Sequence, residues 1–156
     1  MQGNSELVKK LDELLAEELT AIMQYMVHSE MCDDWGYERL HKLVERRAIQ
    51  EMKHAESLIG RIIFLGGTPT VSKLNAVHIG PDISQQFQFD LNAELEAVKM
   101  YNEAIHLADK VGDAVTRQLL ESIVKDEDSH VDWLEEQLDQ IQQMGIAVYL
   151  STHTKE

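Results

Sequence analysis

The sequence has little cysteine and few basic residues. Its single cysteine, Cys32, has no partner within the chain for a disulfide, and no Cys-x-x-Cys pair is present that would indicate a zinc ribbon or a redox motif. With 28 acidic residues against 14 Lys and Arg, the formal net charge at pH 7 is −14. A charge of this sign repels phosphate backbones and attracts cations, so we expect no nucleic-acid partner.

Long apolar runs are also missing. Stretches such as residues 58–65 are short and are interrupted by Arg61, so no membrane-spanning helix is expected. The first residues, MQGNSELVKK, lack the apolar core of a secretion signal. Together with the single cysteine, these absences predict a cytoplasmic protein without a membrane role. At 156 residues, the length fits one ordinary domain with a substantial core.

Apolar residues recur at helical spacing in four long segments, and no segment shows the alternation of a β-strand. Gly, Pro and Asp residues separate the segments. We therefore predict an all-α domain of two helical hairpins, at about 6–65 and 82–144, followed by a short C-terminal helix at about 146–151. The helices are expected to end near Gly36, Gly66, Gly112 and Gly145, and Asp113 is the expected N-cap of the fourth.

The connection between the second and third helices, residues 66–81, is much longer than the other connections. Its 16 residues can span roughly 50 Å when extended. A helix of about 28 residues is roughly 42 Å long. The connection can therefore recross the whole bundle, which predicts two antiparallel hairpins joined by a long crossover between helices 2 and 3.

Two segments, ELTAIMQY and ELEAVKMY, are variants of one pattern, and each precedes a Glu-x-x-His at the same distance. Four residue pairs share one separation of 76 positions: Glu18 and Glu94, Tyr25 and Tyr101, Glu51 and Glu127, and His54 and His130. The chain is therefore interpreted as a doubled hairpin in which each half contributes two carboxylates and one imidazole.

Helical spacing places these groups inside the bundle. Glu18 lies on the apolar stripe of its helix with Tyr25, and Glu94 repeats this position with Tyr101. Four buried carboxylates without partners would each cost on the order of several kcal/mol, and no inward Lys or Arg follows the repeat. Two divalent cations would balance them, and two imidazoles would complete a ligand shell suited to iron or manganese.

A single Glu-x-x-His is common on solvated helix faces, so one copy would carry little weight. Two copies, each paired with an inward Glu at one common offset, favour a metal centre over a purely structural bundle. The ligand set is the known pattern of ferritin-like di-iron and di-manganese bundles. Tyr25 remains open between a core aromatic that hydrogen-bonds to a ligand and a redox role.

Further motifs extend over nearly the whole chain: the MxG start, DWGYERL from Asp34, EMKHAE from Glu51, RIIFLGGTP from Arg61, and DEDSHVDWLEEQLDQIQQMG from Asp126. With the Glu18 segment, they resemble bacterioferritin, the haem-containing ferritin family. The resemblance implies a ferritin-like four-helix bundle and a 24-mer cage that stores ferric mineral. It also implies a di-iron ferroxidase centre in each subunit and haem b shared by two-fold dimers.

The resemblance assigns a role to each site residue. The terminal iron ligands are Glu18 and Glu94, the bridging ligands are Glu51 and Glu127, and one iron each is bound by His54 and His130. Met52 falls at the position of the axial haem ligand, with one methionine contributed by each of two subunits. The counterpart of Met52 in the repeat is Asp128, so the di-metal site itself does not require a methionine there.

The activity implied by the resemblance is iron storage with ferroxidase chemistry. Ferrous iron enters through acidic channels, is oxidised by dioxygen or hydrogen peroxide, and is deposited as mineral, while a ferredoxin supplies electrons for release. Some family members carry a His and an acid on the cavity side of the second helix, where this chain has Arg46 and Gln50. We therefore expect a centre that passes oxidised iron to the cavity, with His130 swinging aside.

The ligands alone also permit a di-iron oxidase or peroxidase that stores nothing. The lack of a rubredoxin-like cysteine module and the presence of a short C-terminal helix disfavour this alternative. The remaining histidines have no partners in the repeat and are expected at the surface or in packing roles: His28, His41, His78, His106 and His153.

Overall fold

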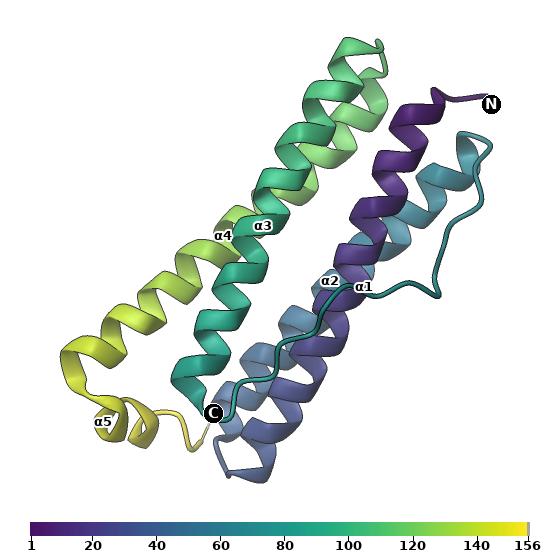
Figure 1. The fold of residues 1–156 in the computed structure, drawn as a ribbon. Coiled ribbons are helices and arrows are strands. Elements are labelled where there is room, and N and C mark those ends of the chain that lie inside the picture. Colours follow the sequence, from purple (N-terminus) through teal and green to yellow (C-terminus); the bar gives the residue numbers. More distant parts are fainter. Residues whose placement is uncertain (156) are drawn as a thin grey trace.

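A computed structural model gives the positions of residues 1–155 and shows four long helices and a short fifth (Figure 1). The helices are α1 (Ser5–Asp34), α2 (Glu38–Phe64), α3 (Ile83–Lys110), α4 (Ala114–Met144) and α5 (Ile146–Ser151). Residues 1–155 contain no strand, so the predicted all-α class is confirmed. Among the helices of this range, none combines the length and the apolar character that crossing a membrane requires.

The helix ends follow the predicted signals. The four glycines that follow the long helices, Gly36, Gly66, Gly112 and Gly145, have φ between 78° and 86°. This left-handed conformation ends a helix and is favoured by glycine. Asp113 is the N-cap of α4, because its Oδ1 accepts a hydrogen bond of 3.0 Å from the backbone N–H of Thr116.

The helices form two antiparallel hairpins, with α1 packed mainly against α2 and α3 mainly against α4. Residues 65–82 run along the length of the bundle from the end of α2 to the start of α3 (Figure 1). This segment is held to α1 by side chains: the backbone N–H of Asn75 donates to Thr20 Oγ1 at 2.8 Å, and that of Gly80 donates to His28 Nε2 at 3.0 Å. The predicted long crossover is confirmed, and His28 has a packing role.

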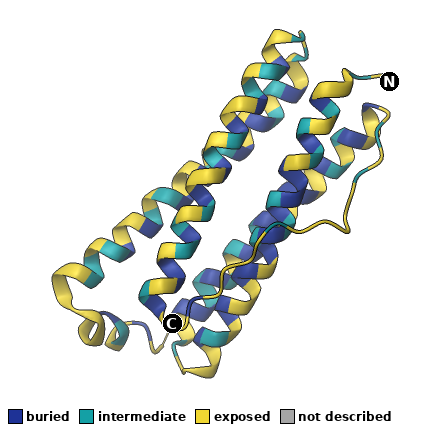
Figure 2. Ribbon diagram, viewed as in Figure 1, coloured by how far each residue is buried: buried dark blue, intermediate teal, exposed yellow. Residues whose placement is uncertain are grey.

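Two main apolar clusters fill the bundle. One contains Leu11, Leu58 and Leu120 from α1, α2 and α4, and the other contains Phe87 and Leu134 from α3 and α4. Figure 2 shows the buried residues on the helix faces that turn toward one another. Each fully buried Leu or Phe contributes roughly 1.5–3 kcal/mol to stability, so these clusters can offset a buried polar layer between them.

The short helix α5 closes one end of the bundle. Tyr149 is fully buried, donates a hydrogen bond of 2.6 Å to Gln137 Oε1, and packs edge-on against Phe87. Beyond α5, the carbonyl of His153 accepts a hydrogen bond of 3.1 Å from the backbone N–H of Arg39. The C-terminal segment therefore joins the start of α3 and the end of α4 to the start of α2, and His153 is a packing residue.

At the opposite end, a polar cluster joins the end of α2 to the start of α4. Arg61 Nη2 lies 3.1 Å from Asp113 Oδ1, and Arg61 Nε donates to Thr116 Oγ1 at 2.8 Å. Burial alone would raise the pKa of Asp113, but the hydrogen bonds from Thr116 and the charge of Arg61 hold it below its ordinary value.

Replacing Asp113 with Ala should lower the free energy of unfolding by about 1–2 kcal/mol, because the variant loses an N-cap and a partner of Arg61. Asp113 should contribute its full stabilisation above the pKa of the unfolded state, which is about 3.9. This stabilisation should be lost as the pH falls through the lower pKa of the folded state. Urea unfolding followed by circular dichroism measures both effects. Asp109→Ala, which removes an exposed partner of Arg117, is the control and should cost less than about 0.5 kcal/mol; equal losses would contradict this account.

Candidate metal centre

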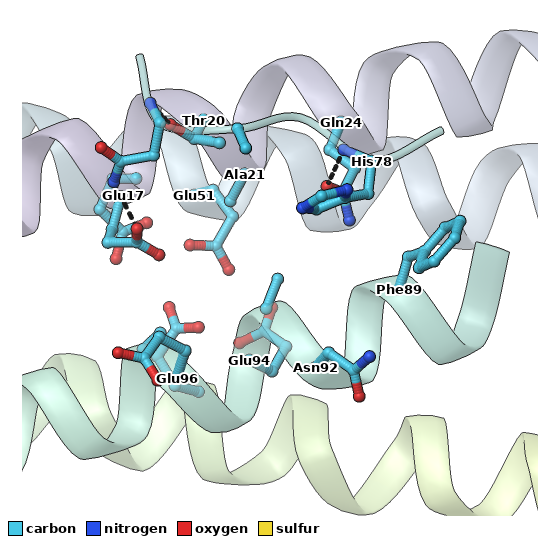
Figure 3. A pocket seen from close by; sticks show the side chains of 16 residues that line it. Glu17, Thr20, Ala21, Gln24, Glu51, His78, Phe89, Asn92, Glu94 and Glu96 are labelled. Carbon is cyan, nitrogen blue, oxygen red and sulfur yellow. Dashed lines mark hydrogen bonds between the residues drawn. The ribbon is translucent and has the colours of Figure 1, made fainter. Parts of the chain in front are cut away.

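The structure brings all six side chains of the doubled motif together in one layer of the bundle. They are Glu18 on α1, Glu51 and His54 on α2, Glu94 on α3, and Glu127 and His130 on α4. None of the six has more than 5% of its surface exposed. Figure 3 shows the carboxylates of Glu51 and Glu94 extending toward one another from opposite hairpins.

The six residues form two overlapping groups of four. The first contains Glu18, Glu51, His54 and Glu127, and the second contains Glu51, Glu94, Glu127 and His130. Within each group, one ligand atom per residue lies within 4.8 Å of the others. Because Glu51 and Glu127 belong to both groups, the arrangement fits two metal ions with two shared carboxylates.

Each shared carboxylate presents one oxygen to each imidazole. Glu51 places Oε2 at 3.4 Å from His54 Nδ1 and Oε1 at 3.1 Å from His130 Nδ1. Glu127 places Oε1 at 2.9 Å from His54 Nδ1 and Oε2 at 3.8 Å from His130 Nδ1. Both imidazoles therefore direct Nδ1 into the centre, and the geometry is that of two bridging carboxylates between two positions.

The carboxylate layer is not neutralised by the protein alone. Within the described part of the chain, Glu18 Oε2 and Glu94 Oε2 are buried without a hydrogen-bond partner. Glu51 Oε1 and Glu127 Oε1 are also buried, and each has an imidazole Nδ1 nearby, at 3.1 Å and 2.9 Å respectively. An unpartnered buried carboxylate costs on the order of several kcal/mol, and two imidazoles cannot offset four of them. These residues fit two divalent cations, which supply the missing positive charge and accept mixed oxygen and nitrogen ligands.

The electrostatics of the layer show the same excess of negative charge. Burial, reinforced by the charges of nearby carboxylates, holds the pKa of Glu51 and that of Glu94 well above their ordinary values. Although burial opposes it, hydrogen bonds with Glu94 and both imidazoles hold the pKa of Glu127 well below its ordinary value. Metal binding requires deprotonated ligands, so it should release protons from this layer.

The two tyrosines of the repeat hydrogen-bond across the bundle to the outer carboxylates. Tyr101 donates to Glu18 Oε1 at 2.5 Å, and Tyr25 donates to Glu94 Oε1. Burial raises the pKa of both phenols, so both remain protonated donors. Tyr25 therefore orients Glu94 in this structure, which supports the positioning role left open by the sequence.

The imidazoles also make outward contacts that cross between the hairpins. His54 Nε2 lies 2.8 Å from Asp126 Oδ2, and His130 Nε2 lies 2.6 Å from Gln50 Oε1. The sequence alone assigned no role to Asp126, and it identified Gln50 only as the residue at a cavity-side position of the second helix. A signal was present, because Gln50 and Asp126 are also 76 residues apart and each directly precedes the Glu of a Glu-x-x-His.

A cavity of about 410 Å³ connects the carboxylate layer with the surface between α1 and α3. Its lining includes the four carboxylates of the layer, Asn75 and His78 from the crossover, and the acidic residues Glu17 and Glu96 (Figure 3). Burial raises the pKa of Glu17, whose carboxylate accepts a hydrogen bond from Asn75. The cavity is therefore lined by carboxyl groups both near its opening and within the buried layer.

Met52 lies outside the metal layer, on the exposed face of α2. It is 48% exposed and lines a hollow of about 290 Å³ with Ile22, Met26, Ala48 and Ile49. Met52 and Glu51 are neighbours in sequence but face different sides of α2, as the rotation of about 100° between successive helix positions predicts.

Glu51→Gln should stabilise the metal-free protein at pH 7 by about 1–3 kcal/mol, because an amide replaces a buried carboxylate whose raised pKa makes its ionised form unfavourable. The gain should shrink as the pH falls below this folded-state pKa and should vanish below the unfolded-state pKa of about 4.3, where the wild-type carboxyl is protonated in both states. The same variant should lose most of the thermal stabilisation that Co²⁺ gives the wild type. Unfolding in the presence of a chelator and of Co²⁺ tests this, with exposed Glu56→Gln as the control. A destabilised metal-free variant that keeps its Co²⁺ response would contradict the assignment.

Comparisons with known proteins agree with this architecture. A family model described as a ferritin-like domain matches residues 8–144. The chain is 38% identical over 145 residues to the bacterioferritin of Brucella melitensis, covering 93% of this chain and 90% of the relative. It is 40% identical over 149 residues to that of Mycolicibacterium paratuberculosis, covering 96% and 94%. It is 39% identical over 145 residues to that of Rhodobacter capsulatus, covering 93% and 90%. The predicted ferritin-like fold is confirmed, and the chain belongs to the bacterioferritin family.

Proposed function

We propose that this protein stores iron and acts as a ferroxidase, with ferrous iron as the substrate of the buried centre. The observation that carries the proposal is the pair of overlapping ligand groups that share Glu51 and Glu127. The centre is desolvated, rich in oxygen ligands and connected to the surface by an acidic cavity. These are the properties required to bind two ferrous ions side by side.

In this proposal, the terminal ligands are Glu18 and Glu94, the bridging ligands are Glu51 and Glu127, and each iron is bound by one imidazole, His54 or His130. Two ferrous ions supply two electrons and become ferric. Dioxygen takes up these two electrons and two protons to give hydrogen peroxide, and hydrogen peroxide as oxidant takes up the same number to give two waters.

Charge balance gives a reason for turnover. Four carboxylates balance the four positive charges of two ferrous ions, whereas two ferric ions carry six. The oxidised pair therefore requires additional anionic ligands or must leave the desolvated layer. We propose that oxidised iron moves to the interior of a cage with displacement of His130, since neither Arg46 nor Gln50 supplies an iron-binding carboxylate on that side.

The acidic cavity supports a path for ferrous iron into the centre. Glu17 and Glu96 contribute carboxylates to its lining, and Glu18 and Glu94 line the same cavity within the buried layer. The net charge of −14 raises the local concentration of cations near such an opening.

The face formed by α1 and α2 supports assembly with a second copy. Its exposed apolar side chains include Met23, Met26, Val27, Ile49 and Met52. Apolar side chains clustered on an exposed face indicate an interaction surface, and the family implies a homo-oligomeric cage of 24 subunits. The ligand set alone also suits a di-iron oxidase or peroxidase, but family membership and this face favour storage.

The hollow around Met52 has the residues to hold half of a haem. Its lining is mainly apolar, with Ser29, Glu30 and Glu45 also present, and Met52 offers a thioether, a soft group that haem iron accepts as a ligand. This chain lines only one side of it, so a second copy would supply the opposite side and a second methionine. Bound there, haem b would carry single electrons between a donor and the stored iron, and a ferredoxin is the donor class that the family implies.

Glu94→Ala should slow the rapid first phase of ferrous oxidation by about 100-fold or more, because one iron loses its terminal carboxylate. Stopped-flow absorbance at two ferrous ions per chain measures the rate. Glu103→Ala is the matched control on α3, since Glu103 is exposed and its ion pair with Lys10 lies near the surface. A folded Glu94→Ala variant that oxidises iron at the wild-type rate would remove the centre from this account.

Met52→Leu should abolish haem binding, because leucine fills the same volume without a sulfur ligand. The Soret absorbance per chain after haem reconstitution measures this, and the rapid phase of ferrous oxidation should be unchanged. Met23→Leu, which changes an exposed methionine of α1, is the control and should keep the wild-type haem spectrum. Retention of a wild-type haem spectrum in Met52→Leu would contradict the assignment of Met52.

A further inference from the structure

The two halves of the metal centre repeat the same ligands, but they differ in the groups that contact the ligands from outside. The Nε2 atom of His54 lies 2.8 Å from a carboxylate oxygen of Asp126. The Nε2 atom of His130 lies 2.6 Å from the amide oxygen of Gln50. Since Nδ1 of each imidazole faces the centre, the outward N–H of one donates to an anion and that of the other donates to a neutral amide.

A second charge increases this difference. The positive charge of Arg47 opposes positive charge at His130. Its guanidinium carbon lies 5.4 Å from the centre of the Trp133 ring, and its Nη1 is buried without a hydrogen-bond partner within residues 1–155. The residue 76 positions later is the buried Ile123, so the other half of the repeat has no equivalent charge.

These contacts act on metal affinity through the imidazoles. A carboxylate that accepts the outward N–H of a histidine fixes the ring and makes the ligand atom more basic, and losing such a partner typically costs about 10–100-fold in metal affinity. His54 has this partner. His130 has a neutral partner, and the charge of Arg47 acts against a cation bound beside it.

We propose that the two metal positions are unequal, and that a divalent cation occupies the His54 position first and leaves it last, with Asp126 and Gln50 as the positioning residues that set the order. This inference rests on the proposed di-metal centre and adds the order of loading. Iron at the His130 position is then the last ion to complete the pair and the first to leave. Oxidised iron should therefore depart from the side of His130.

Substoichiometric Co²⁺ tests the order without catalysis. Crystals of the metal-free protein soaked to one Co²⁺ per chain should show anomalous density mainly at the His54 position, with an occupancy ratio of about tenfold or more. Calorimetric titration should resolve a tighter and a weaker Co²⁺ site. Equal occupancies, or preferential filling of the His130 position, would overturn the inference. Absence of Co²⁺ from both positions would instead overturn the proposed centre itself.

Two nearly isosteric variants assign the cause. Gln50→Glu should tighten the weaker site by about 10-fold and bring the two occupancies together, because both imidazoles then donate to a carboxylate. Asp126→Asn should weaken the tighter site by a similar factor. Asp128→Asn, an exposed change two residues away on α4, should alter neither site. If both variants fold, as judged by circular dichroism, and the occupancy ratio stays at the wild-type value, the outer contacts do not set the order.

Discussion

Four carboxylates lie in one desolvated layer between four helices, and the rest of the structure is arranged around their mutual repulsion. Only two imidazoles face these four carboxylates, and Glu18 and Glu94 each keep a buried oxygen without a hydrogen-bond partner in the described chain, so the layer is unfavourable until cations enter it. The fold tolerates the layer because apolar clusters above and below it supply stability that does not depend on the metal. Stability is thus given up locally for binding capacity, as is common where a site must hold charge.

The topology follows from the need to bring one carboxylate from each helix to the same point. Two antiparallel hairpins joined by a long crossover place equivalent turns of α1 and α3, and of α2 and α4, at the same height. The interactions around the centre therefore cross between the halves: Tyr25 and Tyr101 each contact the carboxylate of the other hairpin, and both imidazoles do the same with their outer partners. The crossover covers the cavity that leads to this layer, so one connection sets both topology and access.

Much of this arrangement was predictable because it depends on periodicity. The helical spacing placed Glu18 and Glu94 on inward faces, and the common offset of 76 residues paired the two halves. The contacts of Asp126 and Gln50 were not predicted, since they join residues 72 and 80 positions apart and depend on how each helix is rotated. The cavity beneath residues 75–78 and the closure of the bundle by Tyr149 also depend on packing that periodicity does not specify.

The most direct test of the central claim is an aerobic titration with ferrous iron that follows ferric absorbance and the iron retained per chain after desalting. A storage protein with this centre should show a rapid phase that saturates at two ferrous ions per chain, followed by continued oxidation in which far more than two irons per chain stay in solution with the protein. Oxidation that ends at two irons per chain would leave a di-iron enzyme without storage. The absence of any rapid phase would contradict the catalytic centre.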